Sequence, residues 1–223
     1  MMDLLPLFPL PNVVLFPNVF LPLHIFEPRY RELVADASMG DRLIGMVLLR
    51  PGWEPDYHGR PAVFPIGCSG VMTHVEKLDD GRYNIVLRGL ERFRIIEENH
   101  ERAYRRALIE SVPEQHPAAD DRAALMNQRA KLEALLAAVV EKGGAAAAQP
   151  GRAESSASYA RTTSAMTDED LVHALAQYLD LEPLEKQALL QHDGIRKRAE
   201  SLVELLEMKI LIARLPGLSN VAH

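Results

Sequence analysis

The chain has almost none of the residues that disulfide or cysteine-based zinc chemistry needs. Cys68 is the only cysteine among 223 residues, so no intrachain disulfide can form. A lone cysteine is usually a small buried hydrophobe, and its isolation favours a reducing compartment. Basic residues are in deficit too, because 25 Lys and Arg face 31 Asp and Glu, a formal net charge of −6. A dedicated nucleic-acid binder typically shows a basic excess, so this balance favours other partners.

Long apolar runs and targeting signals are also missing. The longest runs, Leu43–Leu49 and Ala134–Val140, hold seven residues each, whereas a membrane-spanning helix needs ~20. No Lys or Arg precedes Arg29, and four prolines interrupt the apolar N-terminus, so we do not expect a secretory signal peptide. We therefore expect a cytoplasmic protein with no membrane partner.

The short motifs of familiar enzymes are absent as well. The sequence contains no G-x-x-x-x-G-K-[ST] phosphate loop, no G-x-G-x-x-G turn, no H-E-x-x-H pair and no G-x-S-x-G elbow. The eight histidines are scattered and show no metal-ligand spacing. We therefore predict a protein that is not an enzyme, with no catalytic residues, no metal ligands and no cofactor. A site assembled from distant segments would escape such a search.

Residue patterns divide the chain into a strand-rich part, 1–117, and a helical part, 118–223. In the first part, Leu43–Leu49 is typical of a central strand, and 71–88 predicts a hairpin that turns at Asp79-Asp80-Gly81. A helix is expected to begin at Pro28, with its apolar face formed by Tyr30, Leu33, Val34 and Ala37. Several short strands with one inserted helix indicate a small β-barrel and an α+β fold class.

Prolines shape the first strands of this part. Leu4–Leu10 and Val13–Phe16 are short apolar runs interrupted or separated by proline. Because proline has no amide hydrogen for a strand ladder, we expect these runs at sheet edges or strand starts.

The helical part contains four amphipathic patterns and a linker. We predict a flexible connection over 143–165, which is rich in Gly, Ala, Pro and Ser. The first helix is expected to end at Gly143, and Thr167 is placed to cap the next. The apolar stripes of these helices are expected to pack against one another as a bundle.

An ordered series of short motifs in the first part resembles a known family. In this sequence the segments are Leu5–Leu10, Val14–Pro17, Leu21–Tyr30, Ile44–Leu48, Ile66-Gly67, Asp80–Tyr83 and Arg88–Ile95. The series is similar to the N-terminal, substrate-binding domain of Lon proteases, and most similar to stand-alone bacterial members that lack the ATPase and peptidase modules. It covers residues 4–112 closely and the helical part more loosely.

The resemblance implies a PUA-like pseudo-β-barrel with one inserted helix, followed by a C-terminal α-helical bundle. It also implies a non-enzymatic module that binds unfolded or exposed apolar polypeptide segments, and an ATP-dependent protease as a partner. Within the motifs, we expect Phe8, Phe16, Phe26, Tyr30 and Phe93 to be core aromatics. We also expect Glu27 to cap the helix at Pro28 or to pair with Arg29 or Arg92.

The loop after Leu49 is the predicted peptide-binding site. Residues 50–61 contain the only tryptophan, a tyrosine, three prolines and two glycines. Rigid aromatic side chains on loops supply large contact areas at low entropic cost. We therefore select Trp53, Tyr57 and Phe64 as candidate peptide contacts. The two structural alternatives are that Trp53 folds back as a lid on the barrel, or that an extended peptide adds to a barrel edge.

The alternative function is RNA binding, which other PUA-like barrels perform. Residues 82–106 carry seven arginines against four glutamates, and a phosphate-contacting stripe would use Arg88, Arg92, Arg94, Arg105 and Arg106. The competing interpretation is a solvated strand exterior laced with ion pairs. The acidic net charge makes nucleic acid the less expected partner.

Overall fold

The computed structural model describes residues 4–115, 119–145 and 165–214. The predicted flexible segment 143–165 lies almost entirely outside them, and its first three residues belong to a helix that runs past Gly143 to Ala145. The elements are β1 Leu5–Leu10, β2 Phe20–Ile25, α1 Pro28–Met39, β3 Leu43–Leu48, the 3-10 turn η1 Glu54–Asp56, β4 Ile66–Lys77, β5 Tyr83–Asn99, β6 Arg105–Val112, α2 Ala119–Ala145, α4 Asp168–Tyr178, α5 Pro183–Gln191 and α6 Ile195–Arg214.

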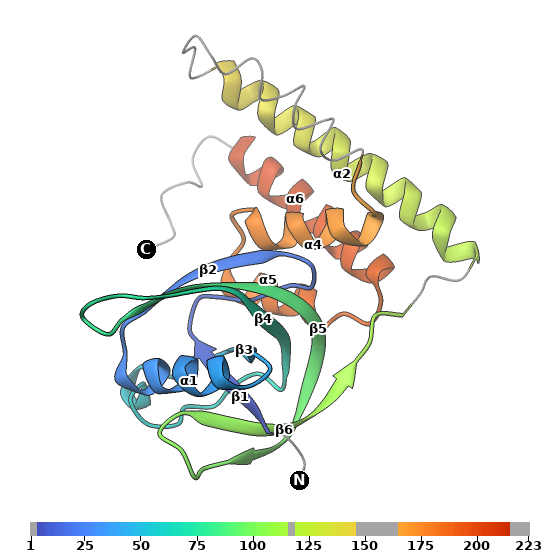
Figure 1. Ribbon diagram of the computed structural model, residues 1–223. Helices are drawn as coiled ribbons and strands as arrows, with labels where there is room; N and C mark the ends of the chain where they lie inside the picture. The colour runs from blue at the N-terminus through green and yellow to red at the C-terminus, as the bar shows by residue number, and fades with distance from the viewer. Residues whose placement is uncertain (1–3, 116–118, 146–164, 215–223) are drawn as a thin grey trace. The chain divides into compact units, whose positions relative to one another are not determined.

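The six strands form one sheet that closes on itself (Figure 1). Their order is β2-β5-β4-β3-β1-β6, and β5 also pairs with β6, so five strands complete a ring while β2 is attached to β5 alone. Only the β1–β3 pairing is parallel. Long β5 makes this closure possible because its first half pairs with β2 and its second half with β6. The predicted small barrel and the α+β class are confirmed.

The proline-rich first strand lies inside the sheet, so the prediction of an edge position is wrong for β1. Pro6 pairs only with β6, and Pro9 pairs only with β3. The β1–β3 ladder begins at Leu7, after Pro6, and the β1–β6 ladder covers only Leu5 to Leu7, before Pro9. The Pro9 carbonyl instead accepts a hydrogen bond from the Tyr30 hydroxyl. The second predicted run, Val13–Phe16, is not a strand, although its last three side chains are buried.

Helix α1 packs against β1 and carries the face that its sequence predicts. Tyr30, Leu33, Val34 and Ala37 are all buried, and the Tyr30 ring lies 4.3 Å from the Phe8 ring. Cys68 is fully buried in β4, as expected for a small hydrophobe. Phe26 is the exception among the predicted core aromatics, because it follows the last residue of β2 on the outward side and is 61% exposed.

The predicted hairpin joins β4 to β5, and Gly81 supplies the turn with a φ of 80°. Gly89 has a different role. A Cβ atom at this position would lie 2.0 Å from the Phe16 carbonyl oxygen, so only glycine lets the segment before β2 approach β5 this closely. That approach brings two hydrogen bonds, from Asn18 to the Gly89 carbonyl and from the Gly89 amide to the Val19 carbonyl.

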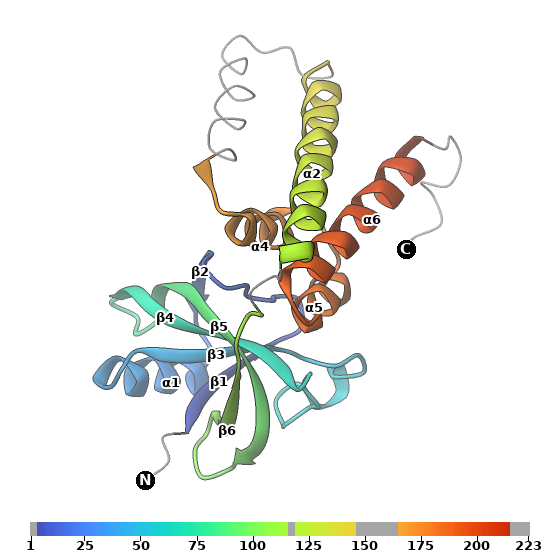
Figure 2. The same cartoon turned by 90° about the vertical axis from the view of Figure 1, so that its right-hand side faces the viewer.

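The described chain divides into two compact units, and the first combines the barrel with residues 173–191. Two glutamines fix this returning segment to the barrel. The Gln187 side chain donates to the Ile66 carbonyl at 2.9 Å, and the Gln177 side-chain oxygen accepts from the Phe16 amide at 3.2 Å. Arg92 on β5 donates to the Leu190 carbonyl at 3.1 Å. Helix α5 therefore packs on the strands of the first unit (Figure 2).

The second unit is helical, and its described residues are 115, 119–145, 165–172 and 192–214. Helices α2 and α6 pack together, and their buried side chains include Leu125, Leu132, Leu202 and Leu206. Thr167 caps α4 as predicted, since its hydroxyl accepts the Asp170 amide and donates to the Asp170 carboxylate. None of the described helices is both long and apolar enough to cross a membrane.

Candidate functional site

The loop between β3 and β4 is closed at its base by hydrogen bonds. The Arg50 amide donates to the Ala62 carbonyl at 2.8 Å, and the Phe64 amide donates to the Leu48 carbonyl at 2.9 Å. The Arg50 side chain donates across the same base to the Val63 carbonyl. The single turn η1 lies inside the loop. Hydrogen bonds therefore tie the two ends of this loop together, so it is not an open connection. We call it the strapped loop.

The far side of the loop is held by residues at the start of α1. The Tyr57 hydroxyl donates to the Glu27 carboxylate at 2.6 Å. Arg29 donates to the same carboxylate at 3.1 Å and to the Tyr57 carbonyl at 3.1 Å. Glu27 occupies the predicted N-cap position of α1, where its carbonyl accepts the Tyr30 and Arg31 amides but its side chain makes no cap hydrogen bond. Its predicted pairing with Arg29 is confirmed. The Glu27 carboxylate is used to anchor the loop instead.

These contacts keep the Tyr57 phenol protonated. Burial and the hydrogen bond to Glu27 both raise the pKa of Tyr57, and the Glu27 charge adds to that shift. A phenol that donates to a carboxylate loses this bond on ionisation, so its neutral form is favoured. Tyr57 therefore remains a donor through the neutral pH range.

The structure brings two of the three predicted peptide contacts together. The Trp53 ring meets the Tyr57 ring edge-on, with 5.3 Å between centroids. Phe64 lies at the loop's base, where the Arg50 guanidinium sits 5.7 Å from its ring centroid. All three aromatic side chains are partly exposed. The loop thus presents aromatic surface that is already fixed in place.

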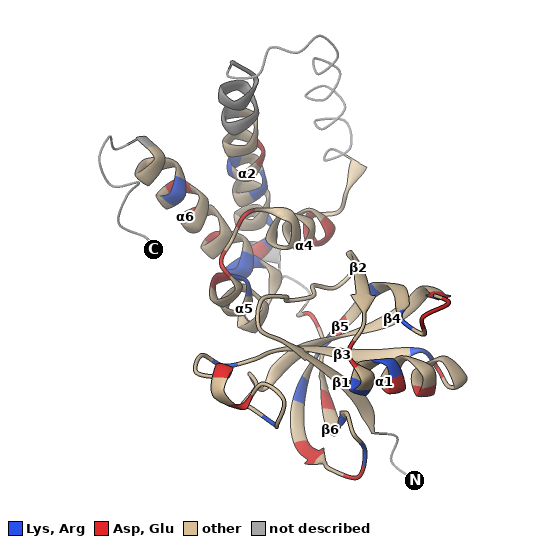
Figure 3. Cartoon of the chain, turned by 90° about the vertical axis from the view of Figure 1, so that its left-hand side faces the viewer, with Lys and Arg blue, Asp and Glu red and all other residues tan. Residues whose placement is uncertain are grey.

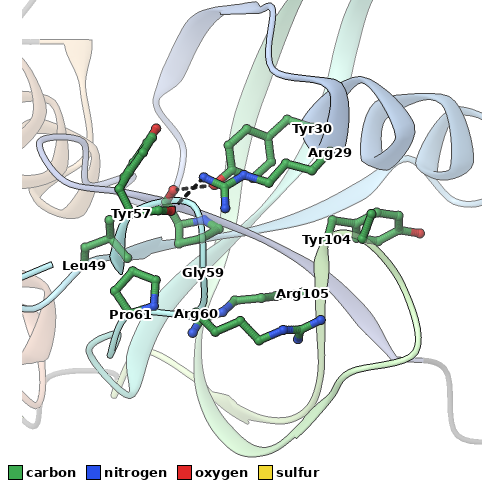
Figure 4. A pocket seen from close by; sticks show the side chains of 11 residues that line it. Arg29, Tyr30, Leu49, Tyr57, Gly59, Arg60, Pro61, Tyr104 and Arg105 are labelled. Atoms are coloured by element: carbon green, nitrogen blue, oxygen red, sulfur yellow. Dashed lines mark hydrogen bonds between the residues drawn. The ribbon is translucent and has the colours of Figure 1, made fainter. Parts of the chain in front are cut away.

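A small cavity of about 20 Å³ opens beside Tyr57 (Figure 4). Its lining includes three arginines, Arg29, Arg60 and Arg105, and three tyrosines, Tyr30, Tyr57 and Tyr104. The exposed residues Gly59, Arg60 and Ala103 lie around its mouth, whereas its inner wall is buried. Burial raises the pKa of Tyr30 well above its usual range, so this part of the wall is neutral.

Arg105 is the buried charge of this cavity. Its side chain is 8% exposed and lies 3.4 Å from the Glu98 carboxylate. Its Nη1 atom is buried and makes no hydrogen bond within the described chain. Burial lowers the pKa of Arg105, Glu98 opposes that shift, and Arg60 and Arg29 add to it. The three arginines are far apart in the sequence, so no local motif marks this cluster.

The five arginines considered for RNA binding are dispersed. Arg92 is buried and lies 3.7 Å from the Glu114 carboxylate, and Arg105 is buried in the cavity. Arg106 pairs with Glu101 at 3.0 Å. Arg88 and Arg94 remain exposed on β5. Figure 3 shows basic and acidic segments interspersed on β5 and β6 rather than a continuous basic face.

The open edge of β2 is poorly suited to accept another strand. The Val19 carbonyl accepts a hydrogen bond from the Gly89 amide. By strand alternation, the backbone N–H and C=O groups of Phe20, Pro22 and His24 therefore point away from β5. Pro22 has no amide hydrogen to offer there, and the Phe20 carbonyl already accepts the Tyr178 hydroxyl at 3.0 Å. Edges blocked in this way are typical protection against strand addition.

A wider groove, of about 720 Å³, lies where β1, β3 and β6 meet the end of α1. Leu5, Leu43 and Ile109 contribute apolar surface, and Tyr104 donates to the Asp36 carboxylate at 2.8 Å within it. No local motif in the sequence marks this groove, because its residues come from four separate elements.

Comparison with known proteins places the chain in a family. The model of the ATP-dependent protease La (LON) substrate-binding domain matches residues 4–208. The chain belongs to this family. The Lon protease of Flavobacterium johnsoniae is 27% identical over 206 residues, which cover 92% of this chain and 24% of that protein. The Lon protease of Anaeromyxobacter dehalogenans is 29% identical over 212 residues, which cover 95% of this chain and 24% of that protein. The chain thus spans about a quarter of these relatives.

Solved structures agree on the fold. The N-terminal domain of Mycobacterium avium complex Lon protease has a TM-score of 0.69 at 15% identity and covers 92% of this Lon-family chain. That match extends over 98% of the solved domain. A Lon N-terminal domain protein from Xanthomonas campestris has a TM-score of 0.57 at 24% identity, covering 91% of this chain and 98% of its own. The predicted family is therefore confirmed, and with it a fold that combines the barrel with C-terminal helices.

Proposed function

We propose that this Lon-family chain recognises polypeptides that expose apolar segments and acts with an ATP-dependent protease. The observation that carries the proposal is the match of residues 4–208 to a substrate-binding domain. The relatives that it matches are Lon proteases, of which it spans about a quarter. The proposed role is recognition alone, without bond cleavage.

The proposed contact surface is the strapped loop that carries Trp53, Tyr57 and Phe64. Its support is preorganisation, because Arg29 and Glu27 hold Tyr57 while Tyr57 backs the Trp53 ring. Aromatic side chains that are fixed before binding lose little entropy on contact with a partner. A surface of this kind suits apolar segments of varied sequence, since ring faces do not require a specific hydrogen-bond pattern.

The test is binding of the full chain to a fluorescently labelled, reduced and carboxymethylated protein that remains unfolded. Trp53→Ala and Tyr57→Ala are expected to weaken binding roughly 5-fold to 30-fold, as losses of central aromatic contacts usually do. Phe26→Ala is the matched control, because Phe26 is an exposed aromatic elsewhere on the barrel unit. Circular dichroism checks that each variant is folded.

Three results would contradict parts of the proposal. Unchanged affinity in both loop variants would remove the loop as the contact surface. Leu4 lines the wide groove. Loss of binding in Leu4→Asp, with binding retained in Trp53→Ala, would assign the contact to that groove instead of the loop. Absence of binding to any unfolded polypeptide would reject polypeptide recognition itself.

The protease partner is tested separately, by capture from a lysate with the full chain as bait. Co-purification of an ATP-dependent protease supports the partnership, and its absence in the presence of bound polypeptides rejects it. No observation in the structure favours the RNA-binding alternative, because two of its five arginines are buried and Arg106 is paired with a glutamate.

A further inference from the structure

Three guanidinium groups converge on the small cavity beside Tyr57, and they come from three separate elements. Arg29 belongs to the first turn of α1, Arg60 follows η1, and Arg105 begins β6. Figure 4 shows the Arg60 and Arg105 side chains running alongside each other below the Arg29 and Tyr57 contact. Like charges brought this close repel one another unless an anion lies between or beside them.

The carboxylates near the cavity do not balance these charges. Glu27 is already bound by Arg29 and by the Tyr57 hydroxyl. Glu98 lies 3.4 Å from Arg105 Nε, a distance at which its attraction is weaker than that of a close bidentate pair. Arg60 donates to the carbonyl oxygens of His100 and Arg102, which carry no charge. Its positive charge is therefore not neutralised by these acceptors.

Arg105 has a donor that nothing in the described chain satisfies. Its Nη1 atom is buried and without a hydrogen bond, and the whole side chain is more than nine-tenths buried. Arginine carries five N–H donors in a fixed planar fork, which fits the two oxygens of a carboxylate. An unmet buried donor on a charged group is unusual in proteins and calls for a partner.

The shape of the cavity limits the anion. About 20 Å³ accommodates a group of roughly water size. One oxygen of a carboxylate fits this space end-on. Pro9, Leu49 and Pro61 in the lining provide apolar surface for the carbon atoms behind a carboxylate. The mouth beside exposed Arg60 and Gly59 opens on the same loop that carries Trp53.

We propose that this cavity binds a carboxylate group of a polypeptide, with Arg105 Nη1 as its buried donor and the positive charge of Arg60 beside its mouth. The carboxylate belongs either to the C-terminus of the bound chain or to an acidic side chain. The inference rests on the proposed function, because the polypeptide itself is held by the adjacent aromatic loop. It adds a polar requirement to recognition that is otherwise apolar.

The first test measures affinity for three labelled peptides that share one apolar sequence. One ends in a free carboxylate, one ends in an amide, and one has an amide end and an internal glutamate. We expect the free-acid peptide to bind about tenfold more tightly than the amide, as a charge-assisted pair would produce. Tight binding of the glutamate peptide assigns the site to side chains as well. Equal affinity for all three peptides overturns the proposal.

Matched variants separate the site from the rest of the surface. Arg60→Ala removes a positive charge at the exposed rim, together with the Arg60 hydrogen bonds to the His100 and Arg102 carbonyls, so circular dichroism checks its fold. It is expected to abolish the preference for a carboxylate. Arg94→Ala is the control, since Arg94 is an exposed arginine on β5 outside the cavity. A preference that survives in Arg60→Ala, or is lost equally in Arg94→Ala, contradicts the assignment.

A second measurement uses acetate as the probe and distinguishes failure of the site from failure of the proposed function. At constant ionic strength, acetate in place of chloride is expected to raise the melting temperature of the full chain and of Arg94→Ala, but not of Arg60→Ala. Stabilisation by acetate without any peptide binding rejects polypeptide as the ligand and the proposed function with it. Binding of unfolded protein without any acetate or carboxylate effect rejects the carboxylate site alone.

Discussion

Replacing Arg92 with methionine tests whether a buried charge holds α5 to the barrel. The Arg92 side chain is 2% exposed, lies 3.7 Å from the Glu114 carboxylate, and donates to the Leu190 carbonyl at 3.1 Å. Methionine keeps much of the volume but removes every donor. The variant therefore leaves Glu114 and the Leu190 carbonyl without this partner.

The size of the effect follows from burial. Removing one partner of a buried ion pair costs about 3–5 kcal/mol, because the other charge remains uncompensated. Glu114 is 14% exposed, so water relieves part of this penalty, and we expect about 3 kcal/mol. For a chain of this length, that loss lowers the melting temperature by roughly 6–12 °C.

Urea unfolding followed by tryptophan fluorescence measures the loss. Trp53 is the only tryptophan and lies in the barrel unit, so its signal reports that unit. Urea is preferred because guanidinium chloride would screen the ion pair. Arg94→Met is the matched control, since Arg94 is exposed on the same strand, and it should change stability by no more than about 0.5 kcal/mol.

A double variant sharpens the test. Glu114→Gln combined with Arg92→Met removes the charge that has lost Arg92 as a partner, so it should recover part of the stability lost in the single variant. A loss below about 1 kcal/mol in Arg92→Met, or a loss no greater than in Arg94→Met, would refute the reasoning. No recovery in the double variant would show that the charge of Glu114 is not the source of the cost.

Two further predictions concern the barrel. Gly89→Ala places a methyl group 2.0 Å from the Phe16 carbonyl oxygen. It should lower the free energy of unfolding in urea by about 1–3 kcal/mol or more. Unchanged stability would show that the two backbone segments move apart without cost. Burial, and then the hydrogen bond to Asp36, raise the pKa of Tyr104 from 10.0 to about 12. Its contribution to stability is thus complete below pH 10 and is lost as the pH rises to about 12. Tyr104→Phe should flatten that decline in melts across this range, and an unchanged decline would contradict the assignment.

Local signals in the sequence were sufficient for most of the barrel. Pro28 and the spacing of Tyr30, Leu33 and Val34 predict α1 correctly because a helix of this kind needs only its own face to be apolar. The hairpin at Gly81 is equally local, since its turn requires a positive φ. The motif series of the Lon family added the barrel's overall order, which periodicity alone does not determine.

The errors arise where a partner far along the chain decides the outcome. Pro9 lies within an interior strand because the β6 ladder ends before it, which no local rule foretells. The stripe on α5 predicts an apolar face but not what covers it. Gln187, which is 1% exposed within that stripe, was the available sign that this face of α5 meets a backbone carbonyl of the barrel.

The candidate site was predictable only in part, for the same reason. Composition marked the loop of Trp53 and Tyr57, because tryptophan, proline and glycine cluster there in the sequence. Charge counting drew attention to Arg105 but grouped it with neighbours on its own strands. Its actual companions, Arg29 and Arg60, come from other elements, and only the closed barrel brings the three together.

The return of residues 173–191 to the barrel has a consequence for synthesis on the ribosome. Residues up to Glu114 emerge first, and Gln115–Val172 must be translated before the last piece of the first unit appears. At roughly 5–20 residues per second, about 60 residues take roughly 3–12 s. Throughout that interval the nascent barrel exposes the Ile66 carbonyl and the Phe16 amide, which Gln187 of α5 and Gln177 of α4 later bind. The first unit of this chain is therefore completed only when residues 173–191 have been made.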